Sequence, residues 1–224
     1  MKRILLASLT SSIAIAAAMP ADATIFIGYS LNGGAITQLA SDTATPGATR
    51  YTGVVGNYLF NLGVLGTPML TQPSLMTQAM VTQIDNGQTG QNNVVSIYFS
   101  NTDLSAFSGG LMSSFTSNLL SGSAQSVMMS TYYNAANAAY SGTLMKMSTF
   151  TGLGVAQGGP AINVAGPFST TVRYDVTFGS GAGTTNDTVN LVAVPEPASW
   201  ALMIVGFGLM GGALRSRKTK VAFA

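Results

Sequence analysis

Few side chains in this sequence could carry catalysis, and aspartates are the main ones. The 224 residues include no His and no Cys, which excludes imidazole general-base catalysis, thiolate nucleophiles, disulfides and Cys-ligated metals. Between residues 24 and 193 the carboxylates are Asp42, Asp85, Asp103, Asp175 and Asp187. Two carboxylates can hydrolyse a glycosidic bond when they lie about 5–10 Å apart. These five are scattered along the chain without local pairing, so we expect turn formers and surface charges rather than the acid–base pair of an enzyme.

Cofactor and metal sites have little support in the sequence. Asp85, followed by Asn86, Gly87 and Gln88, offers hard oxygen ligands in a loop and is a weak calcium candidate, but it lacks the EF-hand spacing. Residues 206–211 spell G-x-G-x-x-G, yet a proline-interrupted linker precedes them and no acidic residue follows, contrary to what a dinucleotide site requires. We therefore expect no cofactor.

The net charge of +2 comes from the two ends of the chain. Six of the nine Lys and Arg residues lie in the first three or the last ten residues, whereas residues 24–193 carry three cations and five anions. A surface that follows a phosphate backbone needs clustered cations. We therefore expect no nucleic-acid partner.

The N-terminal end has the pattern of a secretory signal. Two cations precede an apolar stretch over residues 4–18, and Ala21 and Ala23 supply the small-x-small pattern of a cleavage site. The apolar stretch is short for a bilayer span, which argues against an uncleaved anchor. We predict that residues 1–23 are a signal peptide cut after Ala23, with cleavage after Ala18 as the alternative.

The C-terminal end combines prolines, an apolar run and cations. Residues 198–214 are nearly uniformly apolar, and a cluster of four Lys and Arg residues follows from Arg215 onward. Seventeen helical residues rise about 25 Å, near the short limit for crossing a hydrocarbon core of about 30 Å. Pro195 and Pro197 prevent the helix from extending backwards. We predict a single C-terminal transmembrane helix after an extended, accessible segment.

The same residues resemble a known sorting signal. Their order is similar to that of the PEP-CTERM signal, in the PEPxxWA variant found in alphaproteobacteria. The resemblance rests on Pro195, Glu196, Pro197, Trp200, Ala201, Gly206, Phe207, Gly208, Arg215 and Arg217. It implies that residues 194–224 are an address, read and cut near Pro-Glu-Pro by a membrane-embedded exosortase, rather than an active site. Residues 218–224 continue past Arg217, where most such signals stop at or soon after the Arg run, and have no explanation.

The resemblance also implies a route for the protein. The precursor would be anchored transiently in the inner membrane of a Gram-negative bacterium, with its body in the periplasm. After processing, the body would reach the cell surface or the extracellular matrix, in association with exopolysaccharide or biofilm.

The exported body, residues 24–193, is expected to be one domain. It is rich in Gly, Thr, Ser, Asn and Gln, which favours many short strands joined by polar turns. Strands are predicted over 24–31, 94–99, 171–178 and 188–194; in the third, an apolar row alternates with a polar row containing an Arg–Asp pair. We predict an all-β fold, an antiparallel, jelly-roll-like β-sandwich.

The segment 111–140 fits two patterns. Leu111, Phe115 and Leu119 recur at every fourth position, as in a helix. Val127, Met129, Thr131 and Tyr133 occupy every second position, as on one face of a strand. Residues 143–150 could pair back with them as a hairpin. We favour strands, with one short helix allowed.

Three functions are compatible with these patterns. The favoured one is a non-enzymatic surface or matrix protein whose partner is an exosortase. The alternative is a carbohydrate-binding module that takes polysaccharide on a polar face or on a platform of Tyr132, Tyr133 and Tyr140. The third is a glycoside hydrolase that uses two of the aspartates.

Overall fold

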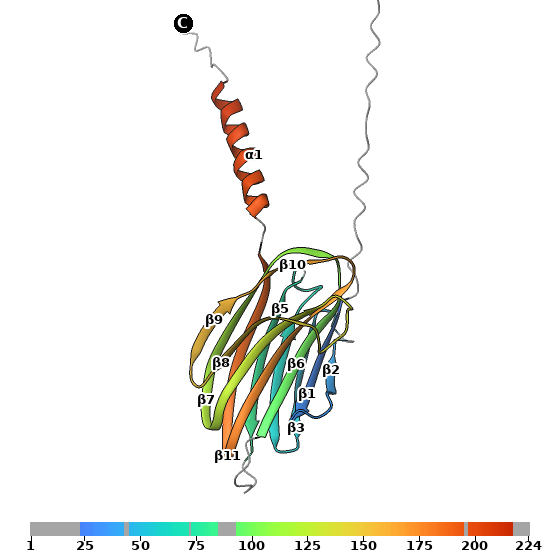
Figure 1. Ribbon diagram of the computed structural model, residues 1–224, viewed down its shortest axis with the longest axis vertical. Helices are drawn as coiled ribbons and strands as arrows, with labels where there is room; N and C mark the ends of the chain where they lie inside the picture. Colours follow the sequence, from blue (N-terminus) through green and yellow to red (C-terminus); the bar gives the residue numbers. More distant parts are fainter. Residues whose placement is uncertain (1–22, 43–44, 72, 85–92, 195–196, 217–224) are drawn as a thin grey trace, which may run out of the picture.

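The described part of the chain is almost entirely β-structure. The computed structural model describes residues 23–42, 45–71, 73–84, 93–194 and 197–216. The strands are β1 (Thr24–Leu31), β2 (Thr37–Ser41), β3 (Ala48–Val55), β4 (Tyr58–Leu65), β5 (Leu75–Gln83), β6 (Asn93–Leu104), β7 (Phe107–Asn134), β8 (Thr143–Phe150), β9 (Gly154–Gly158), β10 (Ala161–Val164) and β11 (Phe168–Val194), and the helix is α1 (Pro197–Ser216) (Figure 1). Every strand pair among them is antiparallel. The prediction of an antiparallel, all-β body is confirmed.

Two long strands join all the others into one sheet. The first half of β11 pairs with β6 and with the end of β7, whereas its second half pairs with β5 and with the start of β7. Both long strands turn back near their middles, at the lower end of the body in Figure 1. The pairing register shifts there, next to Gly122 (φ 63°) and Gly181 (φ 89°). Glycine adopts this left-handed backbone without steric cost, so the two strands reverse together and stay paired.

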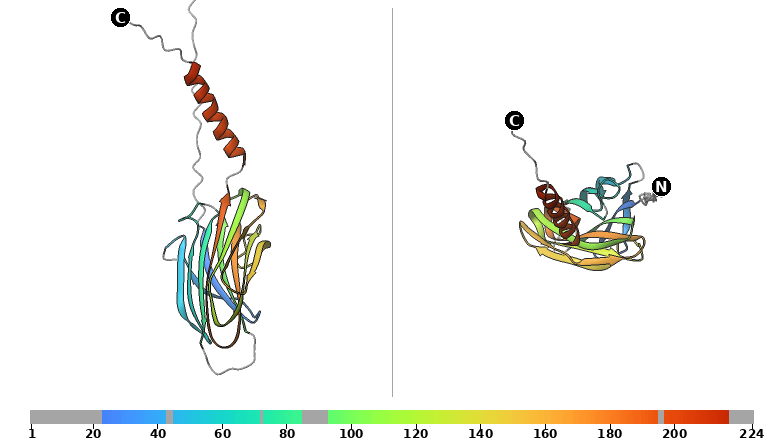
Figure 2. Two further views of the ribbon diagram at one scale, coloured as in Figure 1. Left: turned by 90° about the vertical axis from the view of Figure 1, so that its left-hand side faces the viewer. Right: turned by 90° about the horizontal axis from the view of Figure 1, so that it is seen from above.

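The sheet curls until its edges approach each other (Figure 2). One path across it runs β2-β1-β6-β11-β5-β4-β3, with β7 and its partners β8, β9 and β10 attached at β11. At the near edges, Thr49 Oγ1 of β3 donates a hydrogen bond of 3.3 Å to the carbonyl oxygen of Ser41 in β2. The sheet is therefore nearly closed into a barrel-like shape. The prediction of a jelly-roll-like β-sandwich is confirmed only as far as this antiparallel β-architecture, in which β7 and β11 continue from one half into the other.

The core lies inside the curl and follows the alternation of strand side chains. In the first half of β11, Val172, Tyr174, Val176 and Phe178 are fully buried. In the second half the inward positions continue with Val189 and Leu191, which are also fully buried. Apolar burial of this extent is the main source of stability for the sheet.

The ambiguous segment 111–140 contains strand and no helix among its described residues. β7 pairs with β8 as a hairpin, with Val127 opposite Phe150. Leu111 and Phe115 of the fourfold series are buried at inward positions with Ser113 and Ser117 between and after them, whereas Leu119 is 39% exposed, so the spacing does not mark one apolar face. The preference for strands is confirmed, and the allowed helix is absent.

The helix α1 follows the last strand and projects beyond the end of the body (Figure 1). Its side chains from Ala201 to Gly212 are exposed. Within the described ranges, no helix is long and apolar enough to cross a membrane. The prediction of a transmembrane helix over 198–214 is thus not confirmed; α1 includes four glycines without side chains and has Arg215 in its last turn.

Candidate functional site

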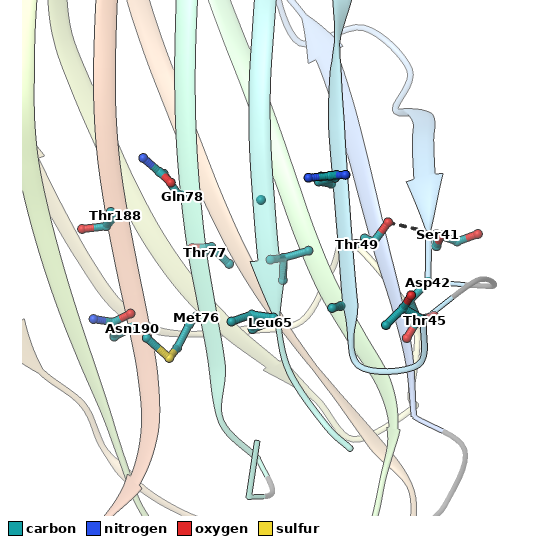
Figure 3. A pocket seen from close by; sticks show the side chains of 14 residues that line it. Ser41, Asp42, Thr45, Thr49, Leu65, Met76, Thr77, Gln78, Thr188 and Asn190 are labelled. Carbon is teal, nitrogen blue, oxygen red and sulfur yellow. Dashed lines mark hydrogen bonds between the residues drawn. The ribbon is translucent and has the colours of Figure 1, made fainter. Parts of the chain in front are cut away.

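An open groove crosses the outer face of β3, β4, β5 and the second half of β11. Its volume is about 800 Å³. On one side lie Thr188, Gln78, Asn190 and Met76, and on the other lie Thr49, Ser41, Asp42 and Thr45 (Figure 3). The groove runs across the strands, so residues from four separate parts of the sequence share it.

Strand pairing aligns the groove residues in two rows. In the first row, Arg50 lies opposite Gly63, Gly63 opposite Gln78, and Gln78 opposite Thr188. We call these four residues the Arg50 row. Neighbouring strands are about 4.8 Å apart, so the row spans roughly 14 Å.

The second row lies one pleat further along the same strands. Ala48 lies opposite Leu65, Leu65 opposite Met76, and Met76 opposite Asn190. We call these four the Leu65 row. Because side chains alternate between the faces of a strand, both rows point outward while the residues between them fill the core. The groove therefore has a polar row next to a mainly apolar one.

Gly63 provides the low point of the Arg50 row. A Cβ atom placed on Gly63 would have no atom within 4 Å, so the space above its backbone is open. The side chains of Arg50 and Gln78 flank this gap from the two neighbouring strands. Gln78 Nε2 donates a hydrogen bond of 3.3 Å to Asn186 Oδ1 outside the row, which leaves its carbonyl oxygen available to a ligand.

The charge of the groove is set by one cation. Arg50 is exposed and has no ion-pair partner among the described residues. The single acidic residue in the lining, Asp42, is 6% exposed, and its Oδ2 accepts a hydrogen bond of 2.8 Å from the backbone N–H of Gly47. The accessible charge in the groove is thus positive.

The four described aspartates lie in four different surroundings. Asp103 accepts hydrogen bonds from Asn137 Nδ2 at 2.6 Å and Thr102 Oγ1 at 2.9 Å. Asp175 forms an ion pair of 2.8 Å with Arg173, so the predicted Arg–Asp pair on this strand is confirmed. The expectation that the aspartates are surface charges is wrong for Asp42, Asp175 and Asp187, which are all buried. Asp85 lies outside the described residues, so its calcium role stays a prediction.

Asp187 is the most unusual of these acids because it points into the core. It is fully buried, and neither carboxylate oxygen has a partner that meets hydrogen-bond geometry among the described residues. Burial raises its pKa to about 6, and the nearby hydroxyls of Ser117 and Thr185 act in the opposite direction. Asp187 lies two residues from Thr185 and two from Val189 on β11, so all three side chains point to the inner face of the sheet. The sequence pattern did not predict a carboxylate at an inward position.

The tyrosine platform expected for a glycan is not present at Tyr140. Its ring packs edge-to-face against Phe26 and Tyr98, with centroids 6.5 and 5.9 Å apart. A Cβ atom on Gly28 would lie 3.0 Å from the same ring, so the tyrosine fills the space above that glycine. Tyr140 therefore holds the loop that follows β7 onto the sheet rather than offering a free face.

The residues of the C-terminal signal are only partly described. Pro197 begins α1, which also contains Trp200, and Ala201, Gly206, Phe207, Gly208 and Arg215 follow along the helix with exposed side chains. Pro195, Glu196 and Arg217 lie outside the described residues, as does Ala21. Ala23 is 4% exposed and directly precedes β1. The cleavage positions and the division of the chain at residues 23 and 194 stay predictions.

Sequence reasoning did not find the groove. Arg50, Gln78, Thr188 and Asn190 were not among the candidate residues, because each belongs to a different strand and only strand pairing brings them together. One signal was present: Thr188 and Asn190 are polar at alternate positions of the predicted strand 188–194, which marks an outward polar row.

Comparison with known proteins identifies the C-terminal signal. Residues 193–218 match the PEP-CTERM protein-sorting motif. The motif implies that the protein is exported, processed by an exosortase and sorted to the cell surface. The resemblance noted from Pro195 to Arg217 is confirmed to this extent.

The other comparisons add little about the body. No curated protein is significantly similar to the chain. A solved structure, the isomalto-dextranase of Arthrobacter globiformis T6 complexed with panose, is similar at 18% identity and a TM-score of 0.22. The match covers 64% of this chain and 23% of that one, so the chain spans less than a quarter of that protein's length. A TM-score this low does not indicate a shared fold.

Proposed function

We propose that this chain is a non-enzymatic protein of the cell surface or extracellular matrix of a Gram-negative, exopolysaccharide-producing bacterium. An exosortase reads the PEPxxWA variant of the motif at its C-terminus and cuts near Pro195–Pro197. The observation that carries the proposal is the match of residues 193–218 to the sorting motif. In this proposal the precursor is first anchored in the inner membrane, and the processed body then reaches the cell surface or matrix.

The position of the motif relative to the sheet supports cleavage at this point. The last pair between β11 and β7 joins Val194 to Gly110, and the Pro-Glu-Pro segment begins at the next residue. A cut within that segment removes no strand pairing, although β11 lies centrally between β5 and β7. The body can therefore lose its tail without losing its fold.

Both ends of the body lie on the same side of the molecule. The start of β1 and the end of β11 are at the upper end in Figure 1, where α1 also begins. Signal peptide and sorting tail would thus hold the precursor by one end, and the opposite end would face away from the membrane.

The non-enzymatic part of the proposal is supported by the surroundings of the aspartates. Asp42, Asp103 and Asp175 are each engaged by their own neighbours, and Asp187 is enclosed in the core. A glycosidase needs two carboxylates that face one substrate, which makes the hydrolase hypothesis the weakest of the three.

Replacement of Pro195–Pro197 by three alanines tests the sorting proposal. The unaltered protein should reach the surface fraction with a shortened C-terminus, whereas the variant should remain with the cell membranes at the mass of the uncut tail. Val155→Ala, an exposed change on β9 outside the motif, is the matched control and should behave as the unaltered protein. Equal processing and destination for the two variants would exclude the exosortase route.

A second candidate function, glycan binding by the body, is favoured by the groove. Hydroxyl and carboxamide groups from neighbouring strands point outward along one line there. Ligand sites of this kind combine an apolar surface with a few placed polar groups.

A further inference from the structure

We propose that the groove across β3, β4, β5 and β11 binds an extended acidic glycan, a polysaccharide segment that carries uronate carboxylates. Arg50 pairs with a carboxylate of the ligand, and Gln78, Thr188 and Asn190 hydrogen-bond its hydroxyl groups. This inference rests on the glycan-binding candidate above and names its site and its class of ligand.

The geometry of the groove favours a linear ligand that lies across the strands. The Arg50 row spans four strands, roughly 14 Å at about 4.8 Å per strand, and it is open above Gly63. β4 and β5 are both paired on each side, so they have no free backbone edge to which an extended peptide could add as a strand. β3 is an edge strand paired only with β4, and the side chain of Thr49 there is bonded to Ser41 of β2. Over β4 and β5 recognition must therefore come from side chains, which suits a chain of hydroxyl-bearing rings.

The polar groups in the groove match hydroxyls better than other chemical groups. A carboxamide such as that of Gln78 or Asn190 both donates and accepts, and a threonine hydroxyl such as that of Thr188 does the same. Neighbouring hydroxyl groups on a sugar ring are also donors and acceptors. Leu65 and Met76, exposed by 42% and 41%, provide an apolar surface beside them for the C–H faces of the rings.

The charge of the groove determines the acidic character of the ligand. Arg50 has no ion-pair partner among the described residues, and Asp42 is buried against the backbone of Gly47. A guanidinium binds a carboxylate through two parallel N–H donors, which is stronger and more selective than a contact with a neutral hydroxyl. A single cation with no stacking aromatic in the lining argues against a nucleic acid, which needs several cations or stacking platforms.

The test is affinity gel electrophoresis of the purified full-length chain in detergent through polygalacturonate, an acidic polymer, and pullulan, a neutral one. The unaltered protein should be retarded by polygalacturonate at least tenfold more strongly than by pullulan. Arg50→Ala should lose at least tenfold in affinity for polygalacturonate, and Arg50→Lys should retain part of it because it keeps the charge but not the two-pronged geometry. The retardation should weaken as salt is added.

A second variant tests the place of binding without removing any contact group. Gly63→Phe fills the open space above β4, where an added side chain meets no atom within 4 Å of its Cβ, so the fold should be kept and binding should be lost. Lys146→Ala removes a cation on β8, outside the groove, and should leave retardation unchanged. Thermal unfolding of each variant checks that the sheet is intact.

Results that contradict glycan binding in the groove can be distinguished from results that contradict sorting by an exosortase. If neither polymer retards the protein, or if Arg50→Ala and Gly63→Phe both bind polygalacturonate as well as the unaltered chain, the groove is not the site and the inference is overturned. Equal retardation by both polymers overturns the acidic ligand while leaving glycan binding in place. None of these results bears on the cleavage at Pro195–Pro197, which is measured in cells.

Discussion

The carboxylate of Asp187 lies inside the curled sheet, directly across the β11–β7 pairing from Ser117. The serine hydroxyl and that of Thr185 lower the pKa of this acid, but burial outweighs them and holds the pKa at about 6, above the ordinary value of 3.8. Because the pKa is raised in the folded state, the native protein binds this proton more tightly than the unfolded chain does. Stability contributed by this group is therefore greatest below pH 4 and falls as pH rises toward 6.

We predict that Asp187→Asn stabilises the protein at neutral pH. The variant cannot acquire the buried charge, and a difference of about two pKa units corresponds to about 1–3 kcal/mol in the free energy of unfolding. Urea unfolding at pH 7.5 should show this gain, and the two proteins should become alike near pH 3.5. Ser117→Ala is the companion variant: without the hydroxyl the pKa rises further, so its stability should fall more steeply with pH. A less stable Asp187→Asn protein at pH 7.5 would show that the carboxylate has a structural partner.

We also predict that removing one partner of the ion pair on β11 destabilises the protein. Asp175 is buried and is held by Arg173 at 2.8 Å and by the hydroxyl of Ser96 at 2.5 Å. Arg173→Met leaves the acid without its cation and should cost about 1–3 kcal/mol, a value reduced from that of a fully buried pair because the arginine is 34% exposed. Arg173→Met combined with Asp175→Asn should recover most of the loss in urea unfolding. A double variant as unstable as the single one would contradict this account of the pair.

A third prediction concerns the ring that anchors the loop after β7. The Tyr140 backbone N–H donates to Ser100 Oγ at 2.8 Å, but the buried phenol oxygen has no partner among the described residues. Tyr140→Phe should therefore be neutral or stabilising by up to about 1 kcal/mol, whereas Tyr140→Ala should cost about 2–4 kcal/mol through lost packing on Phe26 and Tyr98. Melting temperatures of the two variants separate ring packing from hydrogen bonding. A loss of stability in Tyr140→Phe comparable to that in Tyr140→Ala would indicate a hydrogen bond to the phenol.

The fourth prediction tests the bend of the long strands. Gly122 has φ 63°, and a Cβ atom there would lie 2.3 Å from the carbonyl oxygen of Ala182, so Gly122→Ala should cost at least about 2 kcal/mol. Gly152, between β8 and β9, has nothing within 4 Å of an added Cβ and no left-handed φ, so Gly152→Ala is the matched control and should change stability by less than about 0.5 kcal/mol. Denaturant midpoints of the two variants give the comparison. Equal effects would mean that the bend tolerates a side chain.

The sequence was informative wherever a strand kept strict alternation. β1 begins and ends at the predicted residues 24 and 31, and the predicted strand 171–178 lies within β11, with its apolar row from Val172 to Phe178 fully buried. The buried serines of β7 obscured the same alternation. The hydroxyls of Ser113 and Thr131 form a hydrogen bond of 2.7 Å, so the inward position of Ser113 does not need an apolar residue.

The curl of the sheet and the groove depend on relationships between distant residues. No local pattern distinguishes a glycine that ends a strand from Gly122 or Gly181, where two long strands reverse together. Likewise, Arg50, Gly63 and Thr188 become neighbours only through the pairing of β3 with β4, β4 with β5 and β5 with β11. The C-terminal signal was predictable because it is contiguous in sequence.

The central claim, that this chain is cut by an exosortase at its sorting motif, is tested most directly by the intact mass of the protein isolated from the surface fraction of its own host. The account predicts a C-terminus within residues 194–197 and the appearance of the uncut tail when the exosortase gene is deleted. A surface protein that ends at Ala224 in both strains would contradict it.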